Sequence, residues 1–142
     1  MKTFSHRKRT HPFEAWLALF AAAACLVITV RLWNAVSATQ GMWPFPALYF
    51  IEMPLLAVLA AIVVMFDTNK VIPWIVTGAL AAFGVLGAMT VGIFYLAIAL
   101  IFAVVSITVD VRASQPNWVH LAFFLLAALL QAGFIILAAN LF

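Results

Sequence analysis

The feature that most constrains this chain is the stretch from Val71 to Val109, which contains no charged side chain. One straight helix over that stretch would be about 60 Å long, roughly twice the thickness of the hydrocarbon core of a bilayer. The chain therefore has to turn back within it. Two glycines and a threonine interrupt the bulky residues between Gly87 and Gly92 (GAMTVG). We expect the turn there, between two apolar helices.

The composition is that of an integral membrane protein. Of the 142 residues, 68% are hydrophobic and 8% are charged, whereas soluble domains are about half apolar and about a quarter charged. We predict an all-α fold, a polytopic membrane helix bundle with five transmembrane helices. The predicted spans are residues 15–33, 47–66, 71–88, 92–110 and 118–141, in a single transmembrane domain of residues 14–142. The alternative is four spans with a re-entrant segment within residues 71–109, which is tolerated only where protein or water surrounds it.

Polar segments separate the predicted spans. Residues 34–46 contain glycine and proline and no charge, which predicts an ordered loop at the membrane face. Residues 67–70 (DTNK) form a tight connection, and residues 110–117 (DVRASQPN) are predicted to form a polar loop. The first apolar run continues through Trp33, which favours a retained first span over a cleaved signal peptide.

The distribution of positive charge predicts the orientation of the chain. Of the seven Lys and Arg side chains, only Arg31 falls on one side of a five-span arrangement, and the rest fall on the other. The side richer in Lys and Arg faces the cytoplasm. We therefore expect the N-terminus in the cytoplasm and the C-terminus outside. The tryptophans fall at the ends of the spans, as expected for an aromatic belt at each interface.

Two parts of the chain indicate its surroundings. The N-terminal tail, residues 1–13, is basic, which predicts contact with anionic lipid headgroups and not with nucleic acid. Its positively charged side chains are Lys2, Arg7, Lys8 and Arg9. The runs WPFPALYFIEMPLL from Trp43 and GAMTVGIFYLAIAL from Gly87 resemble, in general pattern only, small bacterial membrane proteins. This resemblance implies a bacterial plasma membrane and no particular activity.

Two ionisable residues fall inside the predicted spans at similar depths. Arg31 lies near the outer end of the first span, and Glu52 lies near the outer start of the second. A charge in hydrocarbon is costly unless it is paired, hydrated or extended to the interface. We therefore predict an ion pair that clamps the two spans together. The alternative is a polar site for an ion or an anionic headgroup, beside a kink at Pro54.

Small residues recur at helical spacing and predict close contacts between helices, or, as the alternative, a pore lining. They are Ala15, Ala18, Ala22 and Cys25 in the first span, Thr77, Ala81, Gly84 and Ala88 in the third, and Gly92, Ala99, Ala103 and Ser106 in the fourth. In the fifth span we expect Gln131 to make an interhelical hydrogen bond, because an amide in lipid needs a partner on a neighbouring helix.

The sequence shows no signature of a catalytic, cofactor or metal site. The single cysteine, Cys25, excludes a disulfide within the chain and a cysteine-based metal cluster. Among the three histidines only His120 falls in a span, which disfavours a haem held by two histidines. His120 could instead transfer protons at the membrane surface. There is no Gly-rich phosphate loop, HExxH or GxSxG motif. We therefore expect no enzymatic activity, no cofactor and no metal.

These observations predict a non-catalytic integral membrane protein. It would be an accessory or structural subunit of a larger membrane complex, or a small homo-oligomer, whose partners are the bilayer and other membrane subunits or itself. The alternative is a small transporter or channel in which Arg31, Glu52 and Gln131 form the polar lining. A transporter should need Glu52 or Arg31 individually, whereas a clamp should tolerate the joint replacement of both by apolar residues.

Overall fold

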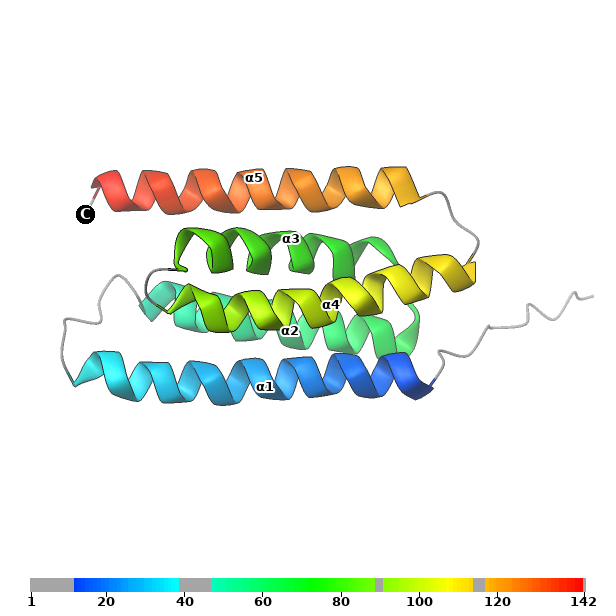
Figure 1. Ribbon diagram of the computed structural model, residues 1–142, viewed down its shortest axis with the longest axis horizontal. Helices are drawn as coiled ribbons and strands as arrows, with labels where there is room; N and C mark the ends of the chain where they lie inside the picture. Colours follow the sequence, from blue (N-terminus) through cyan, green and yellow to red (C-terminus); the bar gives the residue numbers. More distant parts are fainter. Residues whose placement is uncertain (1–11, 39–46, 89–90, 114–116, 142) are drawn as a thin grey trace, which may run out of the picture.

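The computed structural model describes residues 12–38, 47–88, 91–113 and 117–141, and these residues form five α-helices. The helices are α1 (Pro12–Ser37), α2 (Ala47–Phe66), α3 (Val71–Leu86), α4 (Gly92–Ala113) and α5 (Asn117–Leu141). All of them run along the long axis of the molecule, in alternating directions (Figure 1). The prediction of an all-α membrane helix bundle is confirmed.

The lengths of the helices fit a membrane protein. Among the described helices, α1, α2, α4 and α5 are long and apolar enough to cross a membrane, and they carry most of the exposed large hydrophobic side chains. The chain is therefore an integral membrane protein. The remaining helix, α3, is apolar but has 16 residues, which corresponds to about 24 Å.

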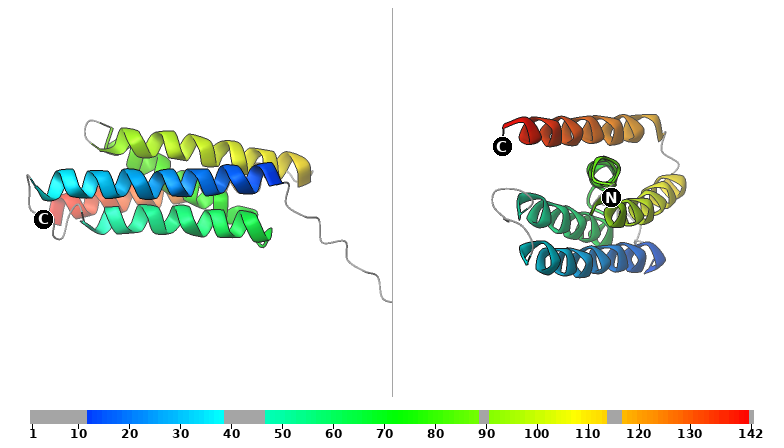
Figure 2. Two further views of the ribbon diagram at one scale, coloured as in Figure 1. Left: turned by 90° about the horizontal axis from the view of Figure 1, so that it is seen from below. Right: turned by 60° about the vertical axis from the view of Figure 1, so that its left-hand side comes forward.

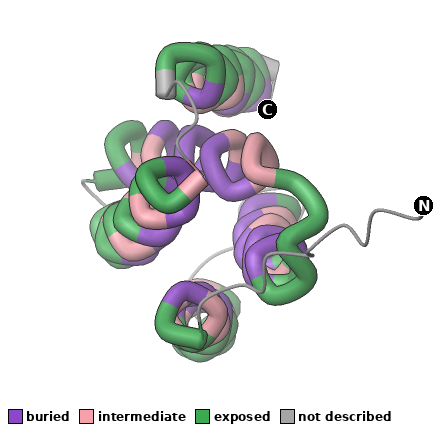
Figure 3. The backbone as a smooth tube through the Cα atoms, turned by 90° about the vertical axis from the view of Figure 1, so that its right-hand side faces the viewer, coloured by how far each residue is buried: buried purple, intermediate pink, exposed green. Residues whose placement is uncertain are grey.

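The short helix α3 occupies the middle of the bundle. It packs against α4 and α5 and, less extensively, against α2, whereas α1 packs against α2 and α4. Viewed along the bundle, α5 lies at one edge and α1 at the opposite edge (Figure 3). Figure 2 shows α5 as an outer layer, and α5 packs chiefly against α3. Of the four long helices, α5 is the least covered by the described protein.

Small side chains allow the helices to approach closely. On α1, Ala18, Ala21 and Cys25 are fully buried, and they belong to the same hydrophobic core as the large side chains of Tyr95 and Phe102 of α4. The predicted stripes of small residues are mostly buried. The exceptions are Ala88, which is exposed, and Ala15, Ala81 and Ala103, which are partly exposed. These faces serve helix packing, as expected where helices associate by close contact and not by the hydrophobic effect.

The turn between α3 and α4 lies where the glycines predicted it. The Gly87 N–H donates to the Phe83 carbonyl at 2.9 Å, and the Gly92 N–H donates to the Gly87 carbonyl at 2.7 Å. These bonds satisfy backbone groups that would be costly to leave unpaired in lipid. A Cβ on Gly92 would overlap the backbone of Gly87. A glycine is therefore required at this position for the turn to be so tight.

The helices extend further into polar sequence than predicted. The predicted loop at residues 34–46 is wrong at its start, because α1 continues to Ser37. The predicted loop at residues 110–117 is wrong at both ends, since residues 110–113 complete α4 and Asn117 begins α5. Asp110 stays in the helix because it finds hydrogen-bond partners inside the bundle. In the predicted tail, residues 12 and 13 belong to α1, and residues 1–11 lie outside the described part of the chain.

A buried hydrogen bond joins α1 to α4. Thr29 Oγ1 lies 2.8 Å from Tyr95 Oη, in a buried environment. We expect Tyr95→Phe to lower the free energy of unfolding by about 1 kcal/mol, the usual value for such a bond between membrane helices. Thr29→Val should do the same. Unfolding in detergent measured for both variants and for the double variant tests this in a double-mutant cycle. Fully additive losses would show that the two hydroxyls do not interact.

Candidate functional site

The bundle has an outer end, where α1 ends and α2 begins, and an inner end, where α1 begins and α4 ends; these names follow the predicted orientation. In the outer half, α2 carries Glu52 five residues after its first residue, Ala47. Gln131 of α5 is buried, and its Nε2 donates a hydrogen bond to Glu52 Oε2 at 3.3 Å. This contact joins two helices that otherwise pack little against each other. A carboxylate thus lies within a membrane-spanning segment with an amide as its partner.

The Glu52 carboxylate lies in a groove on the side of the bundle. The groove runs between α2, α3 and α5 and has a volume of about 690 Å³. Its walls are apolar, with Ile51 and Leu55 from α2, Ala79 from α3, and Leu130 and Phe134 from α5 among the lining residues. It exists because α5 packs chiefly against α3 and leaves the space beside α2 open. The groove faces the lipid and contains two polar side chains, Glu52 and Gln131.

The structure does not bring Arg31 to Glu52. In the described part of the chain the ion pairs are Glu14–Arg112 and Asp110–His120, and Arg31 is exposed on α1. The predicted clamp between the first two spans is therefore absent.

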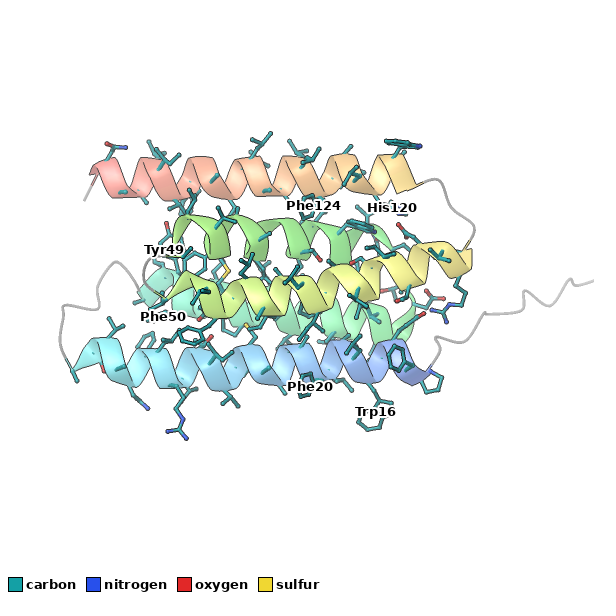
Figure 4. All side chains as sticks on the ribbon, viewed as in Figure 1. Trp16, Phe20, Tyr49, Phe50, His120 and Phe124 are labelled. Atoms are coloured by element: carbon teal, nitrogen blue, oxygen red, sulfur yellow. The ribbon has the colours of Figure 1, made fainter. Side chains whose placement is uncertain are left out.

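Arg31 and Glu52 do not meet because their side chains point away from the contact between α1 and α2. α1 and α2 do meet nearby, where the rings of Trp33 and Phe50 lie 6.3 Å apart. Arg31 and Glu52 are each two residues away from that contact, which is about 200° around a helix. Both charges therefore face away from the contact between α1 and α2. Successive residues of a helix point about 100° apart. Phe50 therefore contacts Trp33 of α1, whereas its neighbour in sequence, Tyr49, contacts Phe83 of α3 (Figure 4).

A second group of polar side chains lies at the inner end. Asp110 of α4 is fully buried. Its Oδ2 accepts a hydrogen bond from Trp74 Nε1 of α3 at 2.9 Å and lies 2.7 Å from His120 Nδ1 of α5. Figure 4 shows His120 on the side of α5 that faces the bundle. Three helices therefore meet at one carboxylate oxygen, and the other oxygen, Oδ1, is buried without a hydrogen-bond partner among the described residues.

An ion pair next to this group connects α4 to α1. Glu14 is buried, and its carboxylate contacts the guanidinium of Arg112. The same end of α4 thus contacts α3, α5 and α1 through polar groups. A buried charge that has its partners in place fixes helix positions, and removing one partner leaves the other uncompensated. We assign this inner group, defined by Glu14, Trp74, Asp110, Arg112 and His120, a structural role as the clamp that the sequence analysis expected at the opposite end.

Sequence reasoning missed this inner group although a signal was present. Asp110 lies three residues before the last residue of α4, and His120 lies three residues after the first residue of α5. In a hairpin of antiparallel helices, two residues equally far from the turn lie at the same level. The spacing therefore indicated that these two side chains lie at the same depth, although it did not identify them as partners.

The remaining predicted site residues add little to either group. Lys2, Arg7, Lys8 and Arg9 lie outside the described residues, and the expected contact with anionic headgroups stays a prediction. Cys25 is a buried, free thiol. Among the described residues, no three His, Cys, Asp or Glu side chains gather closely enough to hold a metal ion.

Comparison of the chain with known protein families, with curated proteins and with solved structures finds no match.

Proposed function

We propose that this chain is a non-catalytic component of a membrane assembly, and that it works by lateral contact with other transmembrane helices. The observation that carries the proposal is the lipid-facing groove that contains Glu52 and Gln131. Ionisable groups in a membrane are almost always paired or face a polar cavity. A groove with apolar walls and one carboxylate suits a neighbouring helix that contributes a cation or a hydrogen-bond donor.

The rest of the described bundle supports a structural component. Phe50, Tyr95 and Phe102 are fully buried and fill the middle of the bundle, so a permeation path would have to follow an outer surface. The polar groups at the inner end contact one another across helix boundaries. The segments between helices are short, the longest being residues 38–46. A globular domain of at least ~50 residues does not fit between any two helices.

The proposal predicts that the chain leaves the membrane as part of a defined assembly. The test is purification of the tagged full chain in mild detergent or in lipid nanodiscs, followed by native mass spectrometry. We expect a stoichiometric complex, either with other chains or with further copies. A monomer that carries no other protein at all concentrations would contradict the proposal.

A photo-crosslinking amino acid tests where the contact lies. Leu130 of α5 lines the groove and is 67% exposed, and Leu100 of α4 is 62% exposed outside it. The crosslinker at position 130 should capture a protein partner in native membranes. The same crosslinker at position 100 is the matched control and should capture lipid. Equal protein capture at both positions would mean that the groove is not the contact surface.

Transport is the second candidate function, because the Glu52 carboxylate at the groove could accept a proton or a cation. The structure separates Arg31 from Glu52 and Gln131, so the three do not form one lining within a single bundle. A transporter would lose its activity in Glu52→Gln while the assembly stays intact. If Glu52→Gln instead alters the stoichiometry of the assembly, the result favours the structural function.

A further inference from the structure

Two charges in the outer half of the bundle have no ionic partner in the part of the chain that the structure describes. Within the described residues, Arg31 and Glu52 take part in neither of the two ion pairs. Glu52 accepts a hydrogen bond from the neutral amide of Gln131, which does not neutralise its charge. Both lie in helices that are long and apolar enough to cross the membrane. A charge in such a place is expected to find a partner of opposite sign.

The two charges lie at the same depth. The Trp33–Phe50 ring contact sets the level of α1 against α2. Arg31 precedes Trp33 by two residues in a helix that runs outward, and Glu52 follows Phe50 by two residues in a helix that runs inward. At 1.5 Å per residue, both charges lie about 3 Å deeper than the ring contact.

The two charges also lie on different faces of the bundle. Arg31 belongs to the exposed face of α1, together with the exposed side chains of Val27 and Val30. Glu52 belongs to the groove between α2, α3 and α5. The contact between α1 and α2 lies between them, so they do not meet within one copy of the chain.

We propose that Arg31 of one copy pairs with Glu52 of a second copy, so that the exposed face of α1 docks into the groove of its neighbour. The inference rests on the proposed function and names its partner. Copies in one membrane share their orientation, so equal depth in one copy means equal depth across the contact. The charges are opposite, and the apolar side chains around Arg31 meet the apolar walls around Glu52. An anionic lipid headgroup has the wrong charge to neutralise Glu52.

Such a contact is heterologous, because each copy contributes the exposed face of α1 to one neighbour and the groove around Glu52 to another. Heterologous contacts build closed rings, or open chains where the rotation between copies does not close. Bilayer phosphate is the competing partner for Arg31, since a long arginine side chain can reach the interface from the outer end of a helix.

Charge reversal tests the pairing on the full chain. We expect Arg31→Glu and Glu52→Arg, each expressed alone, to convert most of the assembly to monomer in native mass spectrometry from nanodiscs. The double variant should assemble again, because each reversed charge meets its reversed partner. Co-expression of the two single variants should also restore assembly, with copies alternating. Lys70→Glu makes the same change of charge at the inner end and is the matched control, which should assemble like the unmodified chain.

Disulfide trapping gives a readout that leaves the charges in place. In a Cys25→Ala background, Val27→Cys lies one turn below Arg31, and Leu55→Cys lies nearly one turn below Glu52. The pair should form disulfide-linked dimers and longer ladders on mild oxidation. Neither cysteine alone should do so, and adding Arg31→Glu should abolish the ladder.

The outcomes separate the inference from the function on which it rests. An assembly that persists in both single charge variants, with no ladder from the cysteine pair, would overturn the pairing and leave the proposed function standing. That result is expected if Arg31 contacts lipid phosphate. An unmodified chain that is always monomeric and captures no partner would overturn both.

Discussion

Replacing Asp110 by asparagine is expected to lower the free energy of unfolding by about 1.5–3 kcal/mol, the range for a hydrogen bond to a charged group. The carboxylate oxygen that Trp74 and His120 share belongs to α4, while its two partners belong to α3 and α5. Asparagine keeps the size of the side chain but removes the charge and half of its acceptor capacity. All three helices should therefore loosen together at the inner end.

Asp67→Asn is the matched control for this substitution. Asp67 lies at the same end, in the exposed connection between α2 and α3, and has a positive φ of 47°. Asparagine tolerates that backbone conformation as well as aspartate does. We expect a change within about 0.5 kcal/mol. Thermal unfolding in detergent measures both variants. Equal losses at the two positions would mean that the effect comes from net charge and not from the buried contacts.

The second large effect is expected at Gly78, where α3 meets α5. A Cβ at this position would overlap the carbonyl oxygen of Phe124 and would lie 3.2 Å from the backbone nitrogen of Ala128. Backbone cannot rotate aside as a flexible side chain can, so the two helices must separate. We expect Gly78→Ala to destabilise the protein by about 1–3 kcal/mol, the usual cost of overpacking a tight contact, and to loosen the attachment of α5.

Gly133→Ala tests whether the position or the loss of a glycine matters. Gly133 lies in α5, and a Cβ there meets nothing within 4 Å. Alanine is the better helix former, so stability should stay the same or rise slightly. The two variants are compared by unfolding in detergent and by protease access to the C-terminal helix. A Gly78→Ala variant as stable as the Gly133→Ala variant would contradict the close approach of α3 and α5.

The positions of the helices could be predicted because they follow from lengths. A span of apolar residues has to cross the hydrocarbon core, and a charge-free stretch of twice that length has to turn where glycines allow it. Depth along the membrane is predicted in the same way, from the number of residues between a side chain and the end of its span.

The direction of each side chain around its helix could not be predicted as well. The prediction of an ion pair between Arg31 and Glu52 takes into account only the depth of the two residues in the membrane. For α1, the angular position of a side chain around the helix follows from the sequence, because Ala18, Ala22 and Cys25 mark the buried face. Arg31 is six residues beyond Cys25, and at 100° per residue this places it about 120° around the helix from that face. The angular position of Glu52 around α2 could not be used in this way. The helix that Glu52 faces is α5, which lies far along the chain from α2.

Polarity also misplaced the inner end of α4. The sequence predicts a loop from Asp110 onward, through Arg112, because charged residues usually lie outside the membrane. Their partners come from α1, α3 and α5, and a local pattern in the sequence contains no information about such partners. A buried polar group can remain in a helix when tertiary contacts satisfy it.

The short middle helix has a consequence for the bilayer itself. At about 24 Å, α3 is shorter than the ~30 Å of hydrocarbon around the protein, and its outer end falls short of the ends of α1 and α5 (Figure 1). The first turn of α4 lies beside the outer end of α3, and its side chains Ile93 and Phe94 are exposed. The apolar surface that contacts lipid is therefore shorter there than along α1. Tails at that point have to bend or tilt to cover it, at a cost of fractions of a kcal/mol per Å. The protein is therefore expected to thin the outer leaflet on one side only.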